Sequence, residues 1–163
     1  MHWSLARSRS RGARWPAFCI HLIDDDRDEE RGKSELHKSV LIVDDEQLLA
    51  RTLSNVLREA GYRTVIAGSA EEAESHVFAD APVDLIVMDN RLPRESGIQM
   101  VRRIRERALR SKVILMTAYE TPEVKSEARR LEVDRYVKKP FDLTALVDDV
   151  KSLIGPGGIS TLG

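Results

Sequence analysis

Short apolar runs alternate with segments of helical period from residue 40 onward. Three runs are continuous rather than alternating: Val40–Val43, Leu85–Met88 and Val113–Met116. Continuous runs of this length are typical of strands buried on both faces of a sheet. Two weaker candidates, Arg63–Ala67 and Asp134–Val137, bring the number of predicted strands to five.

A segment with helical features follows each predicted strand. The clearest runs from about Glu46 to Ala60, and Gly61 ends its apolar stripe. The others begin at residues that favour helix N-termini: Ser69 in a Ser-x-x-Glu capping box, Ser96, Thr121 before a proline, and Asp142. Strands and helices that alternate through short loops are joined by right-handed crossovers, which place the strands parallel to one another. We therefore predict an α/β fold, a doubly wound (βα)5 parallel sheet with helices on both faces.

Polar residues follow the predicted strands, at the sheet edge where doubly wound folds bind ligands. They are Asp44, Asp45 and Glu46 after the first strand, Asp89 after the third, Thr117 and Ala118 after the fourth, and Lys138, Lys139 and Pro140 after the fifth. Two carboxylates about 4 Å apart repel by roughly 4 kcal/mol at an effective dielectric near 20. A hard divalent cation would remove that repulsion.

Mg²⁺ suits this set of side chains because it takes one or two carboxylates together with phosphate oxygens and water. We expect Asp45 and Asp89 to be ligands, with Asp44 in support and a loop carbonyl, such as that of Arg91, completing the site. Phosphoryl transfer needs mainly positioning and charge neutralisation, which a metal, a lysine and a threonine can supply. Asp89 is then the natural nucleophile.

Four segments in this order resemble the CheY-like receiver domains of two-component response regulators. They are Val40–Glu46, Asp84–Asp89, Met116–Ala118 and Tyr136–Phe141. Each lies at the end of a predicted strand, and the resemblance covers about residues 39 to 154. It implies a flavodoxin-like fold in which Asp89 accepts a phosphoryl group from a sensor histidine kinase or a phosphotransfer protein, with Mg²⁺ held by Asp44 and Asp45.

The resemblance also implies roles for the residues after the fourth and fifth strands. Lys139 and Ala118 would contact the phosphoryl group, while Thr117 moves toward it and Tyr136 rotates inward. The Lys139–Pro140 bond is expected to be cis. The output would be a changed surface for an unknown downstream protein, formed by the fourth helix, fifth strand and fifth helix, and homodimerisation on phosphorylation is compatible with it. Such a domain is a signalling phosphoacceptor that acts only on its own phosphorylation, not an enzyme.

Two departures from the family pattern bear on this interpretation. Glu132-Val133 stands where the family often has Gly-Ala, so the backbone conformation of the turn before the fifth strand is expected to be less favourable than in the family pattern. Arg91, two residues after Asp89, is large and cationic, and we expect it to affect how readily water reaches a phosphoaspartate.

Three other functions agree less well with the sequence. A receiver that signals without phosphate is disfavoured by the full set of acidic, hydroxyl and lysine residues. A haloacid-dehalogenase-type phosphatase usually has a second aspartate two residues after its nucleophile, where this chain has Arg91. Nucleotide binding is disfavoured because no Gly-rich loop follows the first strand.

Composition sets the remaining expectations. The net charge is −1, which gives no reason to expect direct nucleic-acid binding. Cys19 is the only cysteine, and no apolar stretch is long enough to span a bilayer, so we expect no membrane insertion and a cytoplasmic protein.

Residues 1–38 carry alternating arginines and then an acidic run, which predicts a disordered extension before a receiver domain at 39–154 and a flexible tail at 155–163. We expect either a single-domain regulator or one truncated at its Gly/Pro-rich end.

Overall fold

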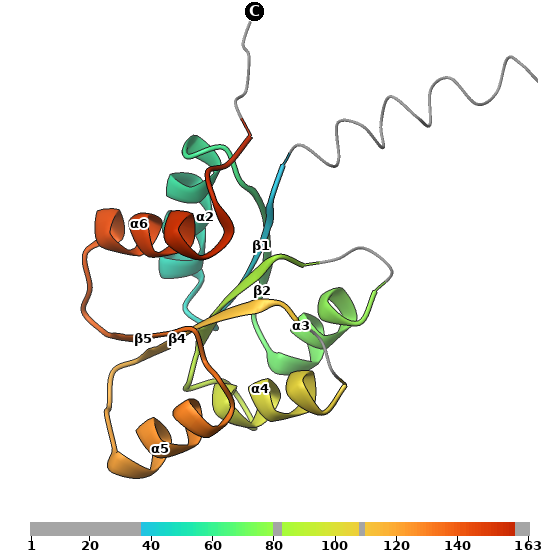
Figure 1. The fold of residues 1–163 in the computed structure, drawn as a ribbon, viewed down its shortest axis with the longest axis vertical. Helices are drawn as coiled ribbons and strands as arrows, with labels where there is room; N and C mark the ends of the chain where they lie inside the picture. The colour runs from blue at the N-terminus through green and yellow to red at the C-terminus, as the bar shows by residue number, and fades with distance from the viewer. Residues whose placement is uncertain (1–36, 80–82, 108–109, 159–163) are drawn as a thin grey trace, which may run out of the picture. The chain divides into compact units, whose positions relative to one another are not determined.

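Five parallel strands form one sheet in the order β2-β1-β3-β4-β5 (Figure 1). The computed structural model describes residues 37–79, 83–107 and 110–158. The strands are β1 (Ser39–Val43), β2 (Arg63–Ala67), β3 (Leu85–Asp89), β4 (Lys112–Thr117) and β5 (Arg135–Lys138). The predicted doubly wound α/β fold is confirmed, and the three continuous apolar runs are its central strands.

Helices cover both faces of the sheet. They are α2 (Gln47–Glu59), α3 (Ala70–Val77), α4 (Gly97–Glu106), α5 (Pro122–Arg130) and α6 (Leu143–Ile154). One buried cluster joins α2 and α6 to the sheet, and a second joins α3, α4 and α5 to the other face. Side chains of β1 alternate between the two clusters, Val40 and Ile42 in one and Leu41 and Val43 in the other, because successive residues of a strand point to opposite faces.

The predicted helix starts are confirmed at the residues named from the sequence. Thr121 accepts a hydrogen bond from the amide of Val124, and Asp142 accepts one from Ala145. Ser69 likewise accepts from the amide of Glu72, but the Glu72 carboxylate accepts from Gly68 rather than from Ser69. The reciprocal half of that capping box is therefore displaced by one residue.

The chain after α6 lies against the turn between α2 and β2. The Tyr62 hydroxyl donates to the carbonyl of Gly155 over 2.6 Å. A Cβ on Gly61 would collide with the carbonyl oxygen of Gly158, and Gly61 has a φ of 89° that disfavours other residues. Residues 155–158 thus pack closely on the domain.

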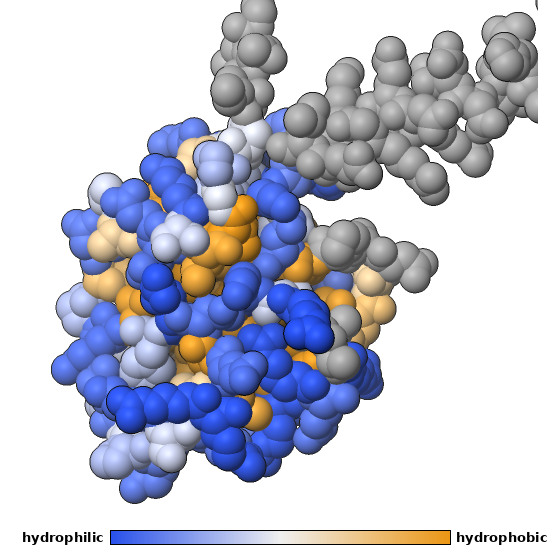
Figure 2. Space-filling view, in the orientation of Figure 1, coloured by the Kyte–Doolittle hydropathy of each residue, from blue (hydrophilic) through white to orange (hydrophobic). Residues whose placement is uncertain are grey.

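Figure 2 shows a mostly hydrophilic face with small apolar patches between the helices. None of the helices in the described part of the chain has the length and apolar content needed to cross a membrane. The extension predicted over residues 1–38 lies outside the described residues apart from His37 and Lys38, as do Cys19 and residues 159–163.

Candidate functional site

Three carboxylates meet at the carboxyl ends of β1 and β3. Asp44 and Asp45 directly follow β1, and Asp89 is the last residue of β3. Asp44 is fully buried and Asp89 is 7% exposed, whereas Asp45 is open to solvent. One oxygen from each lies within 4.8 Å of those of the other two, which is close enough for all three to hold one cation.

The Lys139 ammonium lies between two of these carboxylates. Its Nζ is 2.8 Å from Oδ2 of Asp44 and 2.9 Å from Oδ2 of Asp89. Burial opposes the charge on Lys139, but the hydrogen bonds and negative charges of the two aspartates outweigh it and raise the pKa of the lysine. For the Asp44 carboxyl, burial has the opposite effect and raises the pKa, although the hydrogen bond from Lys139 partly opposes this rise. The site therefore keeps a fixed positive charge beside Asp89.

Backbone amides orient the second oxygen of each buried carboxylate. The amide of Glu46 donates to Oδ1 of Asp44 over 2.8 Å, and that of Arg91 donates to Oδ1 of Asp89 over 3.1 Å. A Cβ on Gly97 would collide with the carbonyl oxygen of Asp89, so the start of α4 packs directly on the end of β3. The Asp89 carboxylate is held by a backbone donor on one side and by Lys139 on the other.

Thr117 and Tyr136 lie at the end of β4 and within β5. The Thr117 hydroxyl donates to the carbonyl of Tyr119 over 2.8 Å, so it is engaged within its own loop. The Tyr136 ring is half-buried, and its hydroxyl is buried with no hydrogen-bond partner among the described residues. Burial raises the pKa of Tyr136, and the nearby Glu120 carboxylate adds to this effect. The Tyr136 hydroxyl is buried and Thr117 bonds to its own loop, and the movements expected of both residues stay predictions.

The remaining predicted residues surround this centre. Ala118 is exposed in the loop after β4, and the Arg91 side chain is exposed with its guanidinium 5.7 Å from the centre of the Tyr119 ring. The bond between Lys139 and Pro140 is cis, as the resemblance implies. The assignment of the Arg91 carbonyl as a metal ligand stays a prediction.

Two features beside the site were not predicted from the sequence. The first is Tyr119, which is 69% exposed and has its ring beside the Arg91 guanidinium. Its position two residues after Thr117 was the sequence feature that could have indicated a place near the site. A groove of about 570 Å³ also opens next to Lys139, lined mainly by apolar residues of α2 and of the segment before α6. Leu48 is 76% exposed at this groove, and its position outside the apolar stripe of α2 could have revealed it.

The family of the chain follows from a comparison with known proteins. The family model of the response regulator receiver domain matches residues 40–151, which include the three carboxylates, Thr117 and Lys139. The chain belongs to this family. As a receiver domain, it is homologous to the response regulators of two-component signalling.

Individual relatives and structures agree with this assignment. Regulatory protein AtoC of Escherichia coli is 42% identical over 107 residues, which are 66% of this chain and 23% of AtoC. Sporulation initiation phosphotransferase F of Bacillus subtilis is 30% identical over 119 residues, 73% of this chain and 95% of that protein. A CheY-like receiver domain protein of Methanospirillum hungatei has a TM-score of 0.68 at 25% identity, covering 71% of this chain and 92% of that one.

Several relatives are considerably longer than the matched region. The match spans 23% of AtoC and about half of two transcriptional regulators, the Bacillus subtilis PhoP (49%) and the Pseudomonas aeruginosa PhoB (54%). The shared part is the receiver domain.

Proposed function

We propose that this receiver domain accepts a phosphoryl group on Asp89 in the presence of Mg²⁺ and changes its surface for a downstream protein. The observation that carries the proposal is the Lys139 ammonium lying within 2.9 Å of both Asp44 and Asp89, at the edge where Asp45 is exposed. This arrangement combines a nucleophile, a fixed cation and carboxylates suited to a hard metal ion. It is a phosphoacceptor that acts on itself, rather than an enzyme with a separate substrate.

Asp44, Asp45 and Asp89 would hold the ion, with the Arg91 carbonyl as a further oxygen ligand. The fit rests on three carboxylate oxygens within 4.8 Å of one another, one of them from a side chain open to solvent. When bound, Mg²⁺ neutralises charge on the transferring phosphoryl group. Every residue of this set is an oxygen donor, as the chemistry of Mg²⁺ requires.

The chain positions the attacking oxygen. Oδ1 of Asp89 accepts a hydrogen bond from the Arg91 amide, and Oδ2 accepts one from the Lys139 ammonium. These two bonds keep the carboxylate at the sheet edge. An Asp89 oxygen attacks the phosphorus of a phosphohistidine, the P–N bond breaks, and the imidazole nitrogen keeps the electron pair. Lys139 then neutralises part of the charge on the acyl phosphate, because it is already in place beside Asp89.

Thr117 and Ala118 would complete the contacts with the phosphoryl group. Thr117 must give up its hydrogen bond to the Tyr119 carbonyl to reach that group, and a bond of this kind is worth about 0.5–1.5 kcal/mol. A charge-assisted bond to the phosphoryl oxygen is stronger than the bond that is lost. The exchange would move the loop after β4, which lies next to Tyr136.

The phosphoryl donor would be a sensor histidine kinase or a phosphotransfer protein. Any protein donor must bring its histidine directly over Asp89 and would therefore cover the neighbouring groove and the exposed Leu48.

The output surface would be formed by α5, β5 and α6, and would bind a downstream protein or a second copy of the domain rather than nucleic acid. We place this activity in the cytoplasm, in a receiver unit of residues 39–154 flanked by an N-terminal extension and a short C-terminal tail.

The experiment is intact-mass measurement of the full chain after incubation with Mg²⁺ and acetyl phosphate. One phosphoryl group should be added to the wild-type chain, and none when EDTA replaces Mg²⁺ or in Asp89→Asn. Lys38→Met is the matched control, because Lys38 is exposed at the opposite end of the sheet. Absence of an adduct, while another receiver domain is labelled in the same tube, would overturn the proposal.

A further inference from the structure

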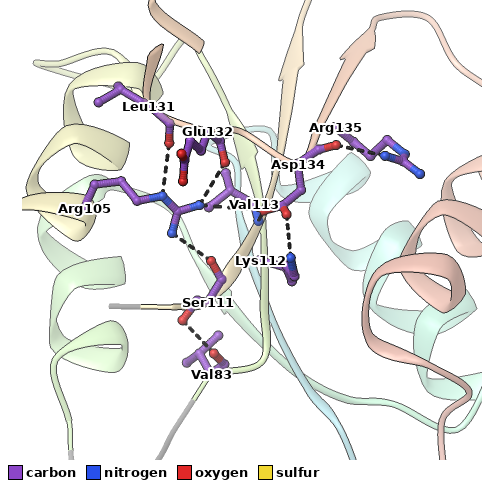
Figure 3. Close-up of polar contacts among 9 residues, drawn as sticks. All are labelled: Val83, Arg105, Ser111, Lys112, Val113, Leu131, Glu132, Asp134 and Arg135. Atoms are coloured by element: carbon purple, nitrogen blue, oxygen red, sulfur yellow. Dashed lines mark hydrogen bonds and ion pairs between the residues drawn. The ribbon is translucent and has the colours of Figure 1, made fainter. Parts of the chain in front are cut away.

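A second polar cluster lies where β4 and β5 begin, as Figure 3 shows. The three carboxylates of the candidate site lie instead at the carboxyl ends of β1 and β3. The Arg105 guanidinium, from the last turn of α4, donates to three backbone carbonyls: Leu131 at 3.1 Å, Ser111 at 3.0 Å and Glu132 at 3.3 Å. It also lies 3.7 Å from the Asp134 carboxylate. One side chain thus joins α4 to the start of β4, the end of α5 and the start of β5.

Physical chemistry explains the choice of arginine here. The carbonyls of Leu131 and Glu132 follow the last turn of α5, where helix carbonyls lack intrahelical partners and a cation is favoured. The planar guanidinium presents its donors on three separate nitrogens, so Nε, Nη1 and Nη2 reach the carbonyls of Leu131, Ser111 and Glu132 at the same time. A lysine could keep the charge but could not keep the three hydrogen bonds.

Asp134 fixes the start of β5 against β4. Its Oδ2 accepts from the amide of Val113 over 2.9 Å, and its own amide donates to the Val113 carbonyl over 3.0 Å. The Lys112 ammonium pairs with Oδ1 at 2.8 Å. Asp134 therefore makes the first link between the two strands, one residue before the regular pairing begins at Arg135.

The register of β5 is poorly specified by burial. It is an edge strand of four residues that pairs with β4 alone, and none of its side chains is fully buried. A slip by one residue would bring Lys138 to the position of Lys139 and Tyr136 to that of Val137. The half-buried side chains of Tyr136 and Val137 pack against opposite core clusters, but this burial specifies the register less strongly than the full burial of β3 does. Contacts at the start of the strand therefore help to select the register.

We propose that Arg105 and Asp134 are positioning residues for Lys139: they fix where β5 begins and so hold the ammonium between Asp44 and Asp89. Lys139 is five residues after Asp134, which corresponds to about 17 Å of extended chain. The position of Asp134 at one end of β5 thus sets the position of Lys139 at the other. The inference rests on the proposed function, because it assigns these residues to the placement of the group that would contact the phosphoryl group.

Asp84 provides a matched comparison within the same sheet. It precedes β3, accepts from the Ser39 amide over 2.8 Å, and pairs with Lys38 as Asp134 pairs with Lys112. Every residue of β3 is buried, however, so burial already specifies its register. Loss of Asp84 should therefore cost stability without moving Asp89, whereas loss of Asp134 should move Lys139.

The test compares Asp134→Ala and Arg105→Met with the controls Asp84→Ala and Arg102→Met in the full chain. Arg102 lies on the same helix and pairs with the exposed face of α5 through Glu127. The phosphorylation rate with acetyl phosphate at saturating Mg²⁺ should fall about tenfold in the first pair, since small misplacements of reacting groups carry penalties of this size or more. Calorimetric Mg²⁺ affinity should stay within about twofold in the two controls, because β1 and β3 hold the carboxylates and Lys139 keeps its place. Mg²⁺ should bind more tightly in the first pair, since displacing the Lys139 ammonium removes a cation from two of the metal-binding carboxylates.

A double variant separates positioning from general destabilisation. In a Lys139→Met background, Arg105→Met should have no further effect on the rate, whereas a merely structural role would lower it again. Amide exchange at Tyr136 and Val137 should accelerate in Arg105→Met while that of β1 is unchanged, and Arg105→Lys should resemble Arg105→Met. Equal rates in Asp134→Ala and Asp84→Ala, or full additivity with Lys139→Met, would overturn the inference. A wild-type chain that is not phosphorylated at all would instead refute the proposed function.

Discussion

Glu132 has a φ of 53°, in the left-handed region that side chains other than glycine seldom adopt. The sequence analysis expected an unfavourable turn here, because Glu132 stands where the family pattern often has glycine, but it did not predict the left-handed conformation. The left-handed conformation costs a residue with a Cβ about 1–2 kcal/mol. The carbonyl of Glu132 accepts a bond from Arg105, which helps to hold the turn in this conformation.

Replacing Glu132 with glycine should therefore stabilise the domain. We expect Glu132→Gly to raise the free energy of unfolding by about 1 kcal/mol, since part of the relieved strain is offset by the greater freedom of glycine in the unfolded chain. Urea unfolding followed by circular dichroism measures this. Glu132→Ala removes the same exposed carboxylate but keeps the Cβ, and should change stability by less than about 0.5 kcal/mol. Equal effects of the two changes would contradict the strain argument.

Arg91 and Tyr119 stand side by side, two residues after Asp89 and Thr117 respectively. If this pair limits the access of water to a phosphorylated Asp89, Arg91→Ala should shorten the lifetime of the acyl phosphate. An exposed cation–π contact is worth about 0.5–1 kcal/mol, so about a two- to fivefold faster loss is expected. The decay of the phosphorylated mass after removal of acetyl phosphate measures it, with Arg94→Ala as the control. An unchanged decay would remove Arg91 from the mechanism.

Individual site residues were predictable from the sequence because each follows an apolar run. The parallel sheet then brings Asp44, Asp89 and Lys139 to one edge. The orientation of Thr117 was not predictable, since its hydroxyl bonds to the carbonyl of Tyr119 two residues away and nothing in the sequence selects that bond.

At the scale of elements, the sequence predicted helix starts better than strand ends. Ser69, Thr121 and Asp142 each cap a helix, because a side-chain oxygen near an unpaired amide is a local interaction. The fifth strand was predicted over Asp134–Val137 and runs over Arg135–Lys138. The difference arises because the Asp134 side chain caps the amide of Val113, a contact between distant parts of the chain.

Glu127 on α5 makes two ion pairs, one within its own helix and one to α4. Glu127 on α5 accepts from Arg130 on the same helix and from Arg102 on α4, both at 2.7 Å. Its hydrogen bonds with Arg130 and Arg102 lower the pKa of Glu127 to about 2 from an ordinary value of 4.5. Because the folded-state pKa is depressed, the stabilisation is present above about pH 4.5 and is lost as the pH falls toward about 2.

Glu127→Gln should reveal this pH dependence. The variant should be less stable than wild type at pH 7, and the difference should shrink as the pH falls from about 4.5 toward about 2 and be smaller in high salt. Urea unfolding at a series of pH values measures it. Glu106→Gln is the control, since Glu106 is exposed and makes no ion pair among the described residues. A stability difference that does not change with pH would contradict the assignment.

At the scale of the whole molecule, the topology was predictable because strands and helices alternate along the chain. Continuous apolar runs must be buried on both faces, which requires helices on each side and parallel strands between them. The groove at Lys139 was not predictable in this way, because it depends on how α2 and the segment before α6 approach each other in space. The close packing of Gly157 and Gly158 on Gly61 likewise depends on a contact between distant segments.

Phosphorylation of Asp89 is central to the proposed function, and the most direct measurement is the site of modification. The full chain is treated with Mg²⁺ and acetyl phosphate, reduced with borohydride to convert an acyl phosphate to an alcohol, and analysed by tandem mass spectrometry of its peptides. We expect homoserine at position 89 alone, at a yield that falls to background with EDTA. Homoserine at position 44 or 45, or unmodified peptide at position 89 in a chain that has gained the mass of a phosphoryl group, would contradict this assignment.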